Sequence, residues 1–372
     1  MKLVAQTAPF IRKPVSVRRM MVDVLIALLP VVLFACIQNG WNGIYVFLIS
    51  IGTMLITEWV AHALIAWPKG MKRRELFSKE GFKKVVDTFT VNNVTAPLIS
   101  AIIFALLMPS GSNWYIVFIG ALFGMLVGKM IFGGLGSNIF NPAAVSRIFV
   151  AICFGGQLTY DKGGVDVAAG GTPLALLSGQ YNLSNIAGAL EQYSLTDLFL
   201  GQVPGSMGEV CTLLILVGGL YLFVRRSADL RASLSMILSF AVLTLTVSLV
   251  TAGIAHVNAM DLFWYEMLSG GLIFGAVFMI TDPVTSPTTK FGRVAFGAAA
   301  GALTALIRYC GAYPEGVAFS ILLVNMLAPT IDHLMRGKPN TYTWKQLTGV
   351  AVVAVILCLI VGFAVAGQLG GL

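Results

Sequence analysis

The sequence predicts an all-α membrane protein, with about ten transmembrane helices in two inverted five-helix repeats plus an additional C-terminal span. Hydrophobic residues make up 57% of the 372 residues and charged residues only 11%, whereas soluble domains carry about 25% charged residues. Apolar runs long enough to cross a hydrocarbon core of about 30 Å recur from Met21 to Ala366. We interpret the first run as a retained span and not as a cleavable signal peptide.

Eleven apolar runs are candidate spans, and several of them are short or interrupted by Gly or Pro. In chain order they cover residues 21–38, 43–66, 94–108, 115–132, 142–154, 208–224, 234–254, 266–280, 294–308, 314–331 and 347–367. The runs predict four parts of the chain: a first transmembrane repeat (1–154), an extracytoplasmic loop (155–207), a second transmembrane repeat (208–335) and an extra C-terminal span (336–372).

The basic residues predict the orientation. They form five clusters beside the spans: Arg12, Lys13, Arg18 and Arg19; Lys69, Lys72, Arg73, Arg74, Lys79, Lys83 and Lys84; Arg225, Arg226 and Arg231; Lys290 and Arg293; and Arg336, Lys338 and Lys345. Alternating the spans places all five on one face, which the positive-inside rule identifies as the cytoplasm. The opposite face keeps Lys162 and Arg308. This distribution indicates contact with membrane lipid and excludes nucleic acid as a partner, despite the net charge of +8.

An internal echo supports the two repeats. Gly120-Ala-Leu-Phe-Gly124 is echoed by Gly297-Ala-Ala-Ala-Gly301, and the turn Met108-Pro-Ser-Gly111 by Thr281-Asp-Pro-Val284. The copies begin an odd number of spans apart, so they are predicted to run in opposite directions. Inverted repeats are typical of transporters and place functional groups near the repeat interface. Chance similarity between Gly/Ala-rich helices is the alternative explanation.

The loop 155–207 contains the first candidate site, the segment Asp166-Val-Ala-Ala-Gly170-Gly171-Thr172-Pro. Long loops without an apolar pattern tend to be functional or disordered. Two glycines before a hydroxyl residue let the backbone approach a ligand and leave the hydroxyl exposed. Thr172 is therefore the leading candidate site residue.

A Gly- and Asn-rich turn, residues 133–142, joins two predicted spans near the cytoplasmic face. Non-helical backbone at membrane depth is tolerated only where it is buried in protein or lines a cavity. Asn138 and Asn141 offer hydrogen-bond donors and acceptors, which the edge of a flat heteroaromatic ring requires. The alternative is a re-entrant turn capped by its own asparagines.

The corresponding turn in the second half is Thr281-Asp282-Pro283-Val284-Thr285-Ser286-Pro287. A carboxylate at membrane depth costs roughly 2.5–3.5 kcal/mol and is often functional. Asp282 is therefore a candidate for a role near a cofactor or a cation. Asp before Pro is also a common turn starter, which is the structural alternative.

The sequence contains no motif for a metal site or for a catalytic nucleophile. The five cysteines are scattered singly, so an iron–sulfur or zinc site built by this chain alone is not expected. The three histidines are isolated, and neither a nucleophile elbow nor a P-loop is present. No catalytic residue and no metal ligand is predicted.

Four ordered motifs carry a family resemblance: Thr7-Ala-Pro-Phe10 with Arg18–Pro30, then Phe132–Ala143, the Thr172 loop, and Thr281–Pro287. Over about residues 5–335 the chain resembles the D subunits of Rnf-type complexes, which are ion-translocating ferredoxin:NAD oxidoreductases. The homologous B subunits of sodium-translocating NADH:quinone oxidoreductases are the second possibility. Those B subunits usually begin with a longer cytoplasmic segment, which favours the Rnf type.

The resemblance implies two flavins. A flavin transferase would attach FMN to Thr172 through a phosphoester, at a pattern close to Asp-x-x-Ser/Thr-Gly-Ala-Thr. Asp166, Gly170 and Thr172 match it, whereas Ala169 and Gly171 replace the usual Ser/Thr and Ala. Gly171 and its neighbours are small and keep the access that the transferase needs. A second, non-covalent flavin, riboflavin, would lie near the turn that holds Asn138 and Asn141.

The resemblance implies an electron-transfer subunit in a bacterial or archaeal cytoplasmic membrane, working with other subunits and not catalysing the overall reaction alone. The sequence leaves open whether sodium or protons are coupled. A stand-alone transporter, suggested by the inverted repeat, and a structural scaffold for partner subunits are the competing functions. A stand-alone transporter needs no flavin attachment loop, and a structural scaffold predicts that Thr172→Ala leaves the turnover of the complex intact.

Overall fold

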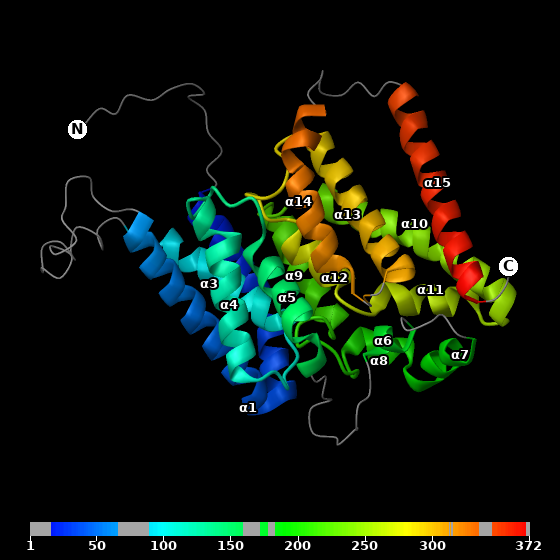
Figure 1. The fold of residues 1–372 in the computed structure, drawn as a ribbon, viewed down its shortest axis with the longest axis horizontal. Coiled ribbons are helices and arrows are strands. Elements are labelled where there is room, and N and C mark those ends of the chain that lie inside the picture. Colours follow the sequence, from blue (N-terminus) through cyan, green and yellow to red (C-terminus); the bar gives the residue numbers. More distant parts are fainter. Residues whose placement is uncertain are drawn as a thin grey trace, which may run out of the picture.

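The computed structural model describes residues 16–65, 89–158, 172–177, 183–311, 313, 315–334 and 344–369, and within these ranges the regular structure is helical, without strands (Figure 1). The first half contains α1 (Val17–Ile65), α3 (Asn92–Leu107), α4 (Trp114–Gly128), η2 (Met130–Phe132), α5 (Pro142–Phe154) and η3 (Gly155–Gln157). The short helices α6 (Pro173–Leu177), α7 (Leu183–Gln192) and α8 (Leu195–Leu200) follow. The second half contains α9 (Thr212–Arg225), α10 (Leu230–Ala255), α11 (Ala259–Leu268), α12 (Leu272–Phe274), the π-helical turn η4 (Gly275–Met279), α13 (Lys290–Cys310), α14 (Val317–Leu334) and α15 (Trp344–Gln368).

Helix α1 is two helices joined at Gly40. Gly40 has φ 54° and ψ −136°, outside the helical region, and this is the gap between the predicted spans 21–38 and 43–66. A residue without Cβ adopts this conformation with little strain. At 1.5 Å per residue an unbroken α1 would be roughly 75 Å long, more than twice the thickness of a hydrocarbon core. The break at Gly40 lets one element supply two apolar segments.

The helices confirm the all-α membrane class. Among the described residues, five helices are long and apolar enough to cross a membrane, or six if the bent pair Ala259–Leu268 and Leu272–Met279 is one span. Four further apolar helices are shorter: Asn92–Leu107, Pro142–Gln157, Thr212–Arg225 and Val352–Gln368. Each predicted span coincides with one of these helices or with a half of α1. The chain is a multi-pass membrane protein, and the count of about ten spans stays a prediction.

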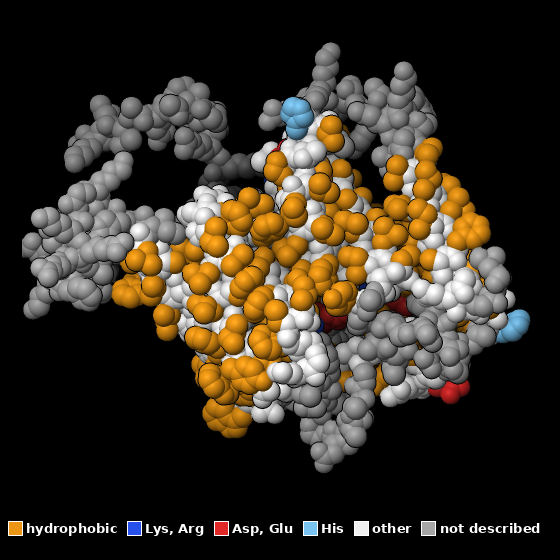
Figure 2. Space-filling model, viewed as in Figure 1, with side chains coloured by type: hydrophobic (Ala, Val, Ile, Leu, Met, Phe, Trp, Pro, Cys, Tyr) orange, Lys and Arg blue, Asp and Glu red, His pale blue; other side chains and the backbone are white. Residues whose placement is uncertain are grey.

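The helices pack as two neighbouring groups (Figure 1). Helix α1 contacts α3, α4 and α9, α4 contacts α5, and α10 contacts α13 and α15. Helix α14 contacts both α13 and α5 and so connects the groups. Hydrophobic side chains cover much of the face of the helices seen in Figure 2. The exposed large hydrophobic residues of the protein include Leu48, Leu216, Leu238 and Phe363. This apolar surface is what a lipid environment requires.

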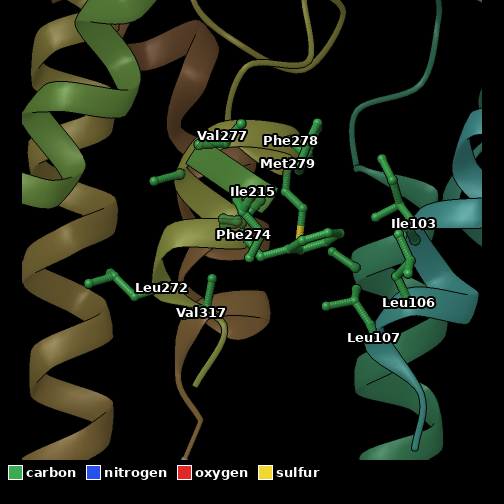
Figure 3. Packing of buried hydrophobic residues seen from close by; sticks show 14 of the residues in the cluster. Ile103, Leu106, Leu107, Ile215, Leu272, Phe274, Val277, Phe278, Met279 and Val317 are labelled. Carbon is green, nitrogen blue, oxygen red and sulfur yellow. The ribbon is translucent and has the colours of Figure 1, made fainter. Parts of the chain in front are cut away.

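The buried core lies where the two groups meet (Figure 3). Ile103, Leu106 and Leu107 of α3 face α12 and η4, which contribute Phe274 and Met279 to the same cluster. Dense packing leaves little room for rearrangement in such a core. Elements from both halves of the chain are therefore held in fixed positions around the site described next.

The echoed glycines make different contacts. A Cβ on Gly124 of α4 would lie 2.7 Å from the carbonyl oxygen of Pro142, at the start of α5. A Cβ on Gly297 or Gly301 of α13 would lie 2.2 Å from a carbonyl oxygen of α10, that of Ala232 or Met236. All three glycines permit close helix packing, but the two copies pack on different partner helices. The inverted repeat stays a prediction.

Candidate functional site

Thr172 immediately precedes α6, at the end of the molecule where α6, α7 and α8 lie (Figure 1). We call this the α6–α8 end. The segment is anchored to α11: Tyr265 is fully buried there and donates its hydroxyl hydrogen to the Pro173 carbonyl oxygen at 3.2 Å. Leu174 is also buried. The chain therefore holds Thr172 against the body of the protein.

Thr172 lines a cavity of about 300 Å³. The walls come from both halves of the chain, and most of the lining side chains are apolar, including Leu107, Ile148, Ala151, Met279, Val317 and Phe319. Thr172 also lines a smaller hollow, to which Leu198 of α8 and the turn residues Ser269 and Gly270 contribute. Small-molecule sites are typically apolar cavities of roughly 300–1,000 Å³ with a few polar groups, so this cavity is the candidate site.

Three charged side chains line the cavity together: Arg147 of α5, Glu209 before α9, and Glu315 before α14. Arg147 Nη2 lies 3.8 Å from Glu315 Oε2. Glu209 and Glu315 both line this cavity and also the smaller hollow. Glu209 is 6% exposed and Arg147 is 8% exposed. Two acidic groups and one basic group therefore share a largely buried space beside Thr172.

Two glycines make room for these carboxyls. Gly270 has φ +71°, and the position of its missing Cβ lies 3.3 Å from Arg308 Nη2 and 3.5 Å from Glu315 Oε1. A Cβ on Gly271 would lie 2.6 Å from Glu209 Oε1. A side chain at either position would displace a charged group, and at Gly270 it would also strain the backbone.

The Gly- and Asn-rich turn contacts the second half of the chain through Asn141. The Asn141 side chain caps α5 by accepting hydrogen bonds from Ala143 N and Ala144 N at 3.0 and 3.5 Å. Its Nδ2 donates to the Met279 carbonyl oxygen at 3.3 Å. Since Met279 lines the cavity, Asn141 supports the cavity wall from behind. Asn138 Nδ2 donates to the Phe140 carbonyl oxygen within the turn at 3.0 Å.

Asp282 lies in the turn after η4, away from the cavity lining. Its carboxylate accepts from Val284 N at 3.1 Å and from the Thr285 hydroxyl at 3.3 Å. The positive charge of Lys129 also acts on this carboxylate, but Lys129 itself pairs with Glu58, with Nζ 2.9 Å from Oε2. The hydrogen bonds are those of a turn starter, and a role near a cofactor or cation stays a prediction.

The structure thus places one leading sequence candidate, Thr172, on the cavity. Asn141 reaches its wall, while Asn138 and Asp282 do not line it. Asp166, Gly170 and Gly171 lie outside the described residues. Sequence reasoning missed Glu209 and Glu315; the available signal was a carboxylate at the start of an apolar run. Among the described residues no group of three or more His, Cys, Asp or Glu side chains is arranged to hold a metal ion.

Residues 4–341 of the chain match the NQR2, RnfD, RnfE family. The chain belongs to this family. The resemblance carried by the four motifs is confirmed, and the match includes the cavity and the Gly- and Asn-rich turn. Helix α15 begins at Trp344, beyond the matched residues, and it packs on α10 and α13.

Relatives from both branches of the NQR2, RnfD, RnfE family are similar over most of the chain. The D subunit of an ion-translocating oxidoreductase complex from Stutzerimonas stutzeri is 32% identical, covering 88% of this chain and 92% of its own. The D subunit of a proton-translocating ferredoxin:NAD(+) oxidoreductase complex from Clostridium ljungdahlii is also 32% identical, with 88% and 92% covered. The B subunit of a Na(+)-translocating NADH-quinone reductase from Ectopseudomonas mendocina is 30% identical, with 89% and 87% covered.

Proposed function

We propose that this protein is the D-type electron-transfer subunit of an ion-translocating ferredoxin:NAD oxidoreductase complex, with FMN bound covalently at Thr172. The observation that carries the proposal is the position of Thr172 on a cavity of about 300 Å³. Family membership and the names of the relatives from Stutzerimonas stutzeri and Clostridium ljungdahlii support it. The NADH-quinone reductase relative has similar identity, so the B-type subunit of a sodium-translocating NADH:quinone oxidoreductase is the second candidate.

The residues around Thr172 suit an attached flavin. The apolar wall from Leu107, Ile148 and Phe319 offers contact for a flat ring, and Arg147 offers a cation for an anionic group. Bound FMN supplies the electron-transfer chemistry, and the protein supplies position and electrostatics. The Tyr265 hydrogen bond to the Pro173 carbonyl oxygen would fix the attachment point.

We also propose a second, non-covalent riboflavin near the Gly- and Asn-rich turn. Gly133, Gly134 and Gly136 all have left-handed φ angles, and without Cβ atoms they leave the backbone of the turn open to a ligand. Asn141 would act by holding the turn on η4, because its side chain already caps α5 and bonds Met279. Asn138 is the better candidate for direct contact with the ring.

The membrane topology of this proposal follows the basic clusters. We propose ten spans in two inverted repeats, with α15 as an added span, in a bacterial or archaeal cytoplasmic membrane. The α6–α8 end would face the extracytoplasmic side, where a flavin transferase could reach Thr172, and the N-terminus would be cytoplasmic. Other subunits of the complex would deliver and accept the electrons.

The test is flavin fluorescence of the denatured protein on a gel, after co-expression with a flavin transferase. Wild type should fluoresce, and Thr172→Ala should lose at least roughly nine-tenths of the signal while still inserting in the membrane, since the only attachment hydroxyl is gone. Thr196→Ala, which changes an exposed threonine of α8 at the same end, should keep the full signal. A flavin-free wild type would contradict the proposal and favour the stand-alone transporter.

Turnover of the whole complex separates the remaining functions. Thr172→Ala should abolish electron transfer from ferredoxin to NAD, whereas a purely structural scaffold would keep its turnover. If the complex instead reduces quinone with NADH and not NAD with ferredoxin, the assignment to the quinone-reducing branch is correct.

A further inference from the structure

Glu209 and Glu315 lie close together at the cavity wall although the two residues are far apart in the chain. The positions of the missing Cβ atoms of the neighbouring Gly271 and Gly270 lie 2.6 Å from Glu209 Oε1 and 3.5 Å from Glu315 Oε1. Both glutamates line the large cavity and also the smaller hollow, and Thr172 lines the same two spaces. The pair therefore faces the space in which a group attached to Thr172 would lie.

The charges around the pair favour one proton. Arg147, with Nη2 3.8 Å from Glu315 Oε2, supplies one positive charge. Two ionised carboxylates would leave a net negative charge in a space where Glu209 is 6% exposed, and like charges that are close together and poorly solvated do not both ionise readily. With one proton on the pair, the three side chains are together neutral.

The other titratable and charged groups nearby are already engaged or lie at the margin. Arg308 of α13 has one nitrogen near Glu315 across Gly270, but its Nη1 pairs with Glu266 Oε2 of α11 at 3.1 Å. That pair is neutral as a unit and almost completely buried. Tyr313 also lines the cavity and is 44% exposed. Arg147 is therefore the cation whose charge acts most directly on the two carboxyls.

We propose that Glu209 and Glu315 share one proton at the cavity wall and exchange it with the redox group in that cavity when the group gains or loses an electron. This inference rests on the proposed function for its exchange partner, a flavin ring. It assigns proton coupling to two side chains that the attachment of FMN at Thr172 does not require.

With a flavin bound, an electron would come from another subunit of the complex, and the flavin would supply the redox chemistry. The pair would then give up its proton to the reduced cofactor: the carboxyl O–H bond breaks, and both glutamates are left as carboxylates beside Arg147. The pair would regain a proton from water at the α6–α8 end, or from the cofactor when the cofactor passes its electron on.

Infrared spectroscopy of the intact complex tests the shared proton directly. In pH-difference spectra the wild type should show the C=O absorption of a carboxylic acid at neutral pH. Glu209→Gln and Glu315→Gln should each remove that absorption, because the remaining carboxyl would ionise beside Arg147. Glu191→Gln changes an exposed carboxyl of α7 at the same end and should leave the absorption unchanged. The shared proton is refuted if wild type lacks the absorption or both variants keep it.

The second readout is the pH dependence of the reduction potential of the covalent flavin. In Glu209→Gln and Glu315→Gln the slope should fall to less than half of the wild-type slope, with covalent flavin still present on the gel. An unchanged slope in both variants would overturn the exchange while leaving the attachment at Thr172 intact.

A flavin-free wild type would instead remove the proposed function and the exchange with it, and the infrared signal would still decide whether the proton is shared. A cavity that binds sodium in place of the proton would show carboxylates only, and that result also overturns the proposal.

Discussion

Two buried groups of charges in this protein differ in how completely they are paired. Lys129 and Glu58 form a contact ion pair, with 2.9 Å between Nζ and Oε2 and side chains only 3% and 1% exposed. At the cavity, Arg147 lies beside two carboxyl groups, its nearest contact to Glu315 is 3.8 Å, and the Glu315 side chain is 24% exposed. The first group is closely paired and does not line the cavity, whereas the second has two acids for one base and lies on the cavity.

The difference separates structure from function. A tightly paired and almost completely buried group, like Lys129–Glu58 or the Arg308–Glu266 pair at 3.1 Å, does not line the large cavity and is out of reach of a ligand bound there. A cluster that has more acidic than basic side chains and lines a cavity can gain or lose a proton without unfolding the protein, because water and a ligand can reach it. Perturbed acids of this kind cluster at functional sites.

The largest expected effect comes from breaking the Lys129–Glu58 pair. Lys129→Ala leaves Glu58 buried without its partner, and we expect a loss of roughly 3–5 kcal/mol in the free energy of unfolding. Thermal unfolding of the purified protein in detergent, followed by circular dichroism, measures the change.

Two variants sharpen this comparison. The double variant Lys129→Met with Glu58→Gln should recover most of the loss, because position 58 then no longer carries a buried charge without its partner. Arg147→Ala at the cavity should cost less, about 1–2 kcal/mol, since Glu315 remains partly solvated. Equal losses for Lys129→Ala and Arg147→Ala would mean that the two groups do not differ in the way described.

An intermediate effect is expected at Asn141, which connects the Gly- and Asn-rich turn to the cavity wall. Asn141→Ala removes the cap of α5, at roughly 0.5–2 kcal/mol, and leaves the Met279 carbonyl unpaired, at roughly 1–3 kcal/mol. We expect the variant to be less stable and to contain less extractable, non-covalent flavin than wild type.

Asn141→Ser is the matched control, because serine also caps helices but does not reach Met279. It should recover the capping part of the stability. If Asn141→Ala binds as much non-covalent flavin as wild type, the second flavin does not depend on this turn.

The smallest effect is expected at Asp229. Its carboxylate belongs to an ion pair that lies outside the spans and away from the two charged groups compared above. Burial would raise the pKa of Asp229, but hydrogen bonds from the Arg231 N–H and from Arg293, with their positive charges, lower it below its usual 3.8. The stabilisation is therefore complete above about pH 3.8 and is lost as the pH falls through the lower, folded-state value.

Asp229→Asn keeps the cap of α10 but removes the charge. We expect it to lose about 0.5–1 kcal/mol at neutral pH, and the difference from wild type should shrink below about pH 4 in acid unfolding curves. A difference that stays constant from neutral to acid pH would show that the charge is not the cause.

The positions of the helices could be predicted because apolar runs and the glycines and prolines between them are local signals. Gly40 illustrates this: the sequence predicts two spans on either side of it, and the structure breaks α1 there. Thr172 is recognisable for a similar reason, because its loop differs in composition from the rest of the chain. Local patterns say little about which helices touch. Gly124 packs against α5, whereas Gly301 in the echoed segment packs against α10.

The acidic pair could not be predicted because it depends on tertiary packing. Glu209 falls within the apolar run 208–224, and Glu315 within an echo of the first repeat. Neither residue is unusual alone. The two side chains come close only because of the turn at Gly270 and Gly271 and the approach of α14 to α5. Arg147 falls within the predicted span 142–154, and the structure places it on the cavity lining with the two carboxyl groups.

The central claim is that Thr172 carries FMN, and peptide mass spectrometry across Asp161–Gln180 tests it most directly. After co-expression with a flavin transferase, the peptide should be heavier by FMN less one water, with the added mass localised to Thr172 by fragmentation. The same peptide from Thr172→Ala should be unmodified. Finding only the unmodified peptide in the wild type, or the added mass on another residue, would contradict the account.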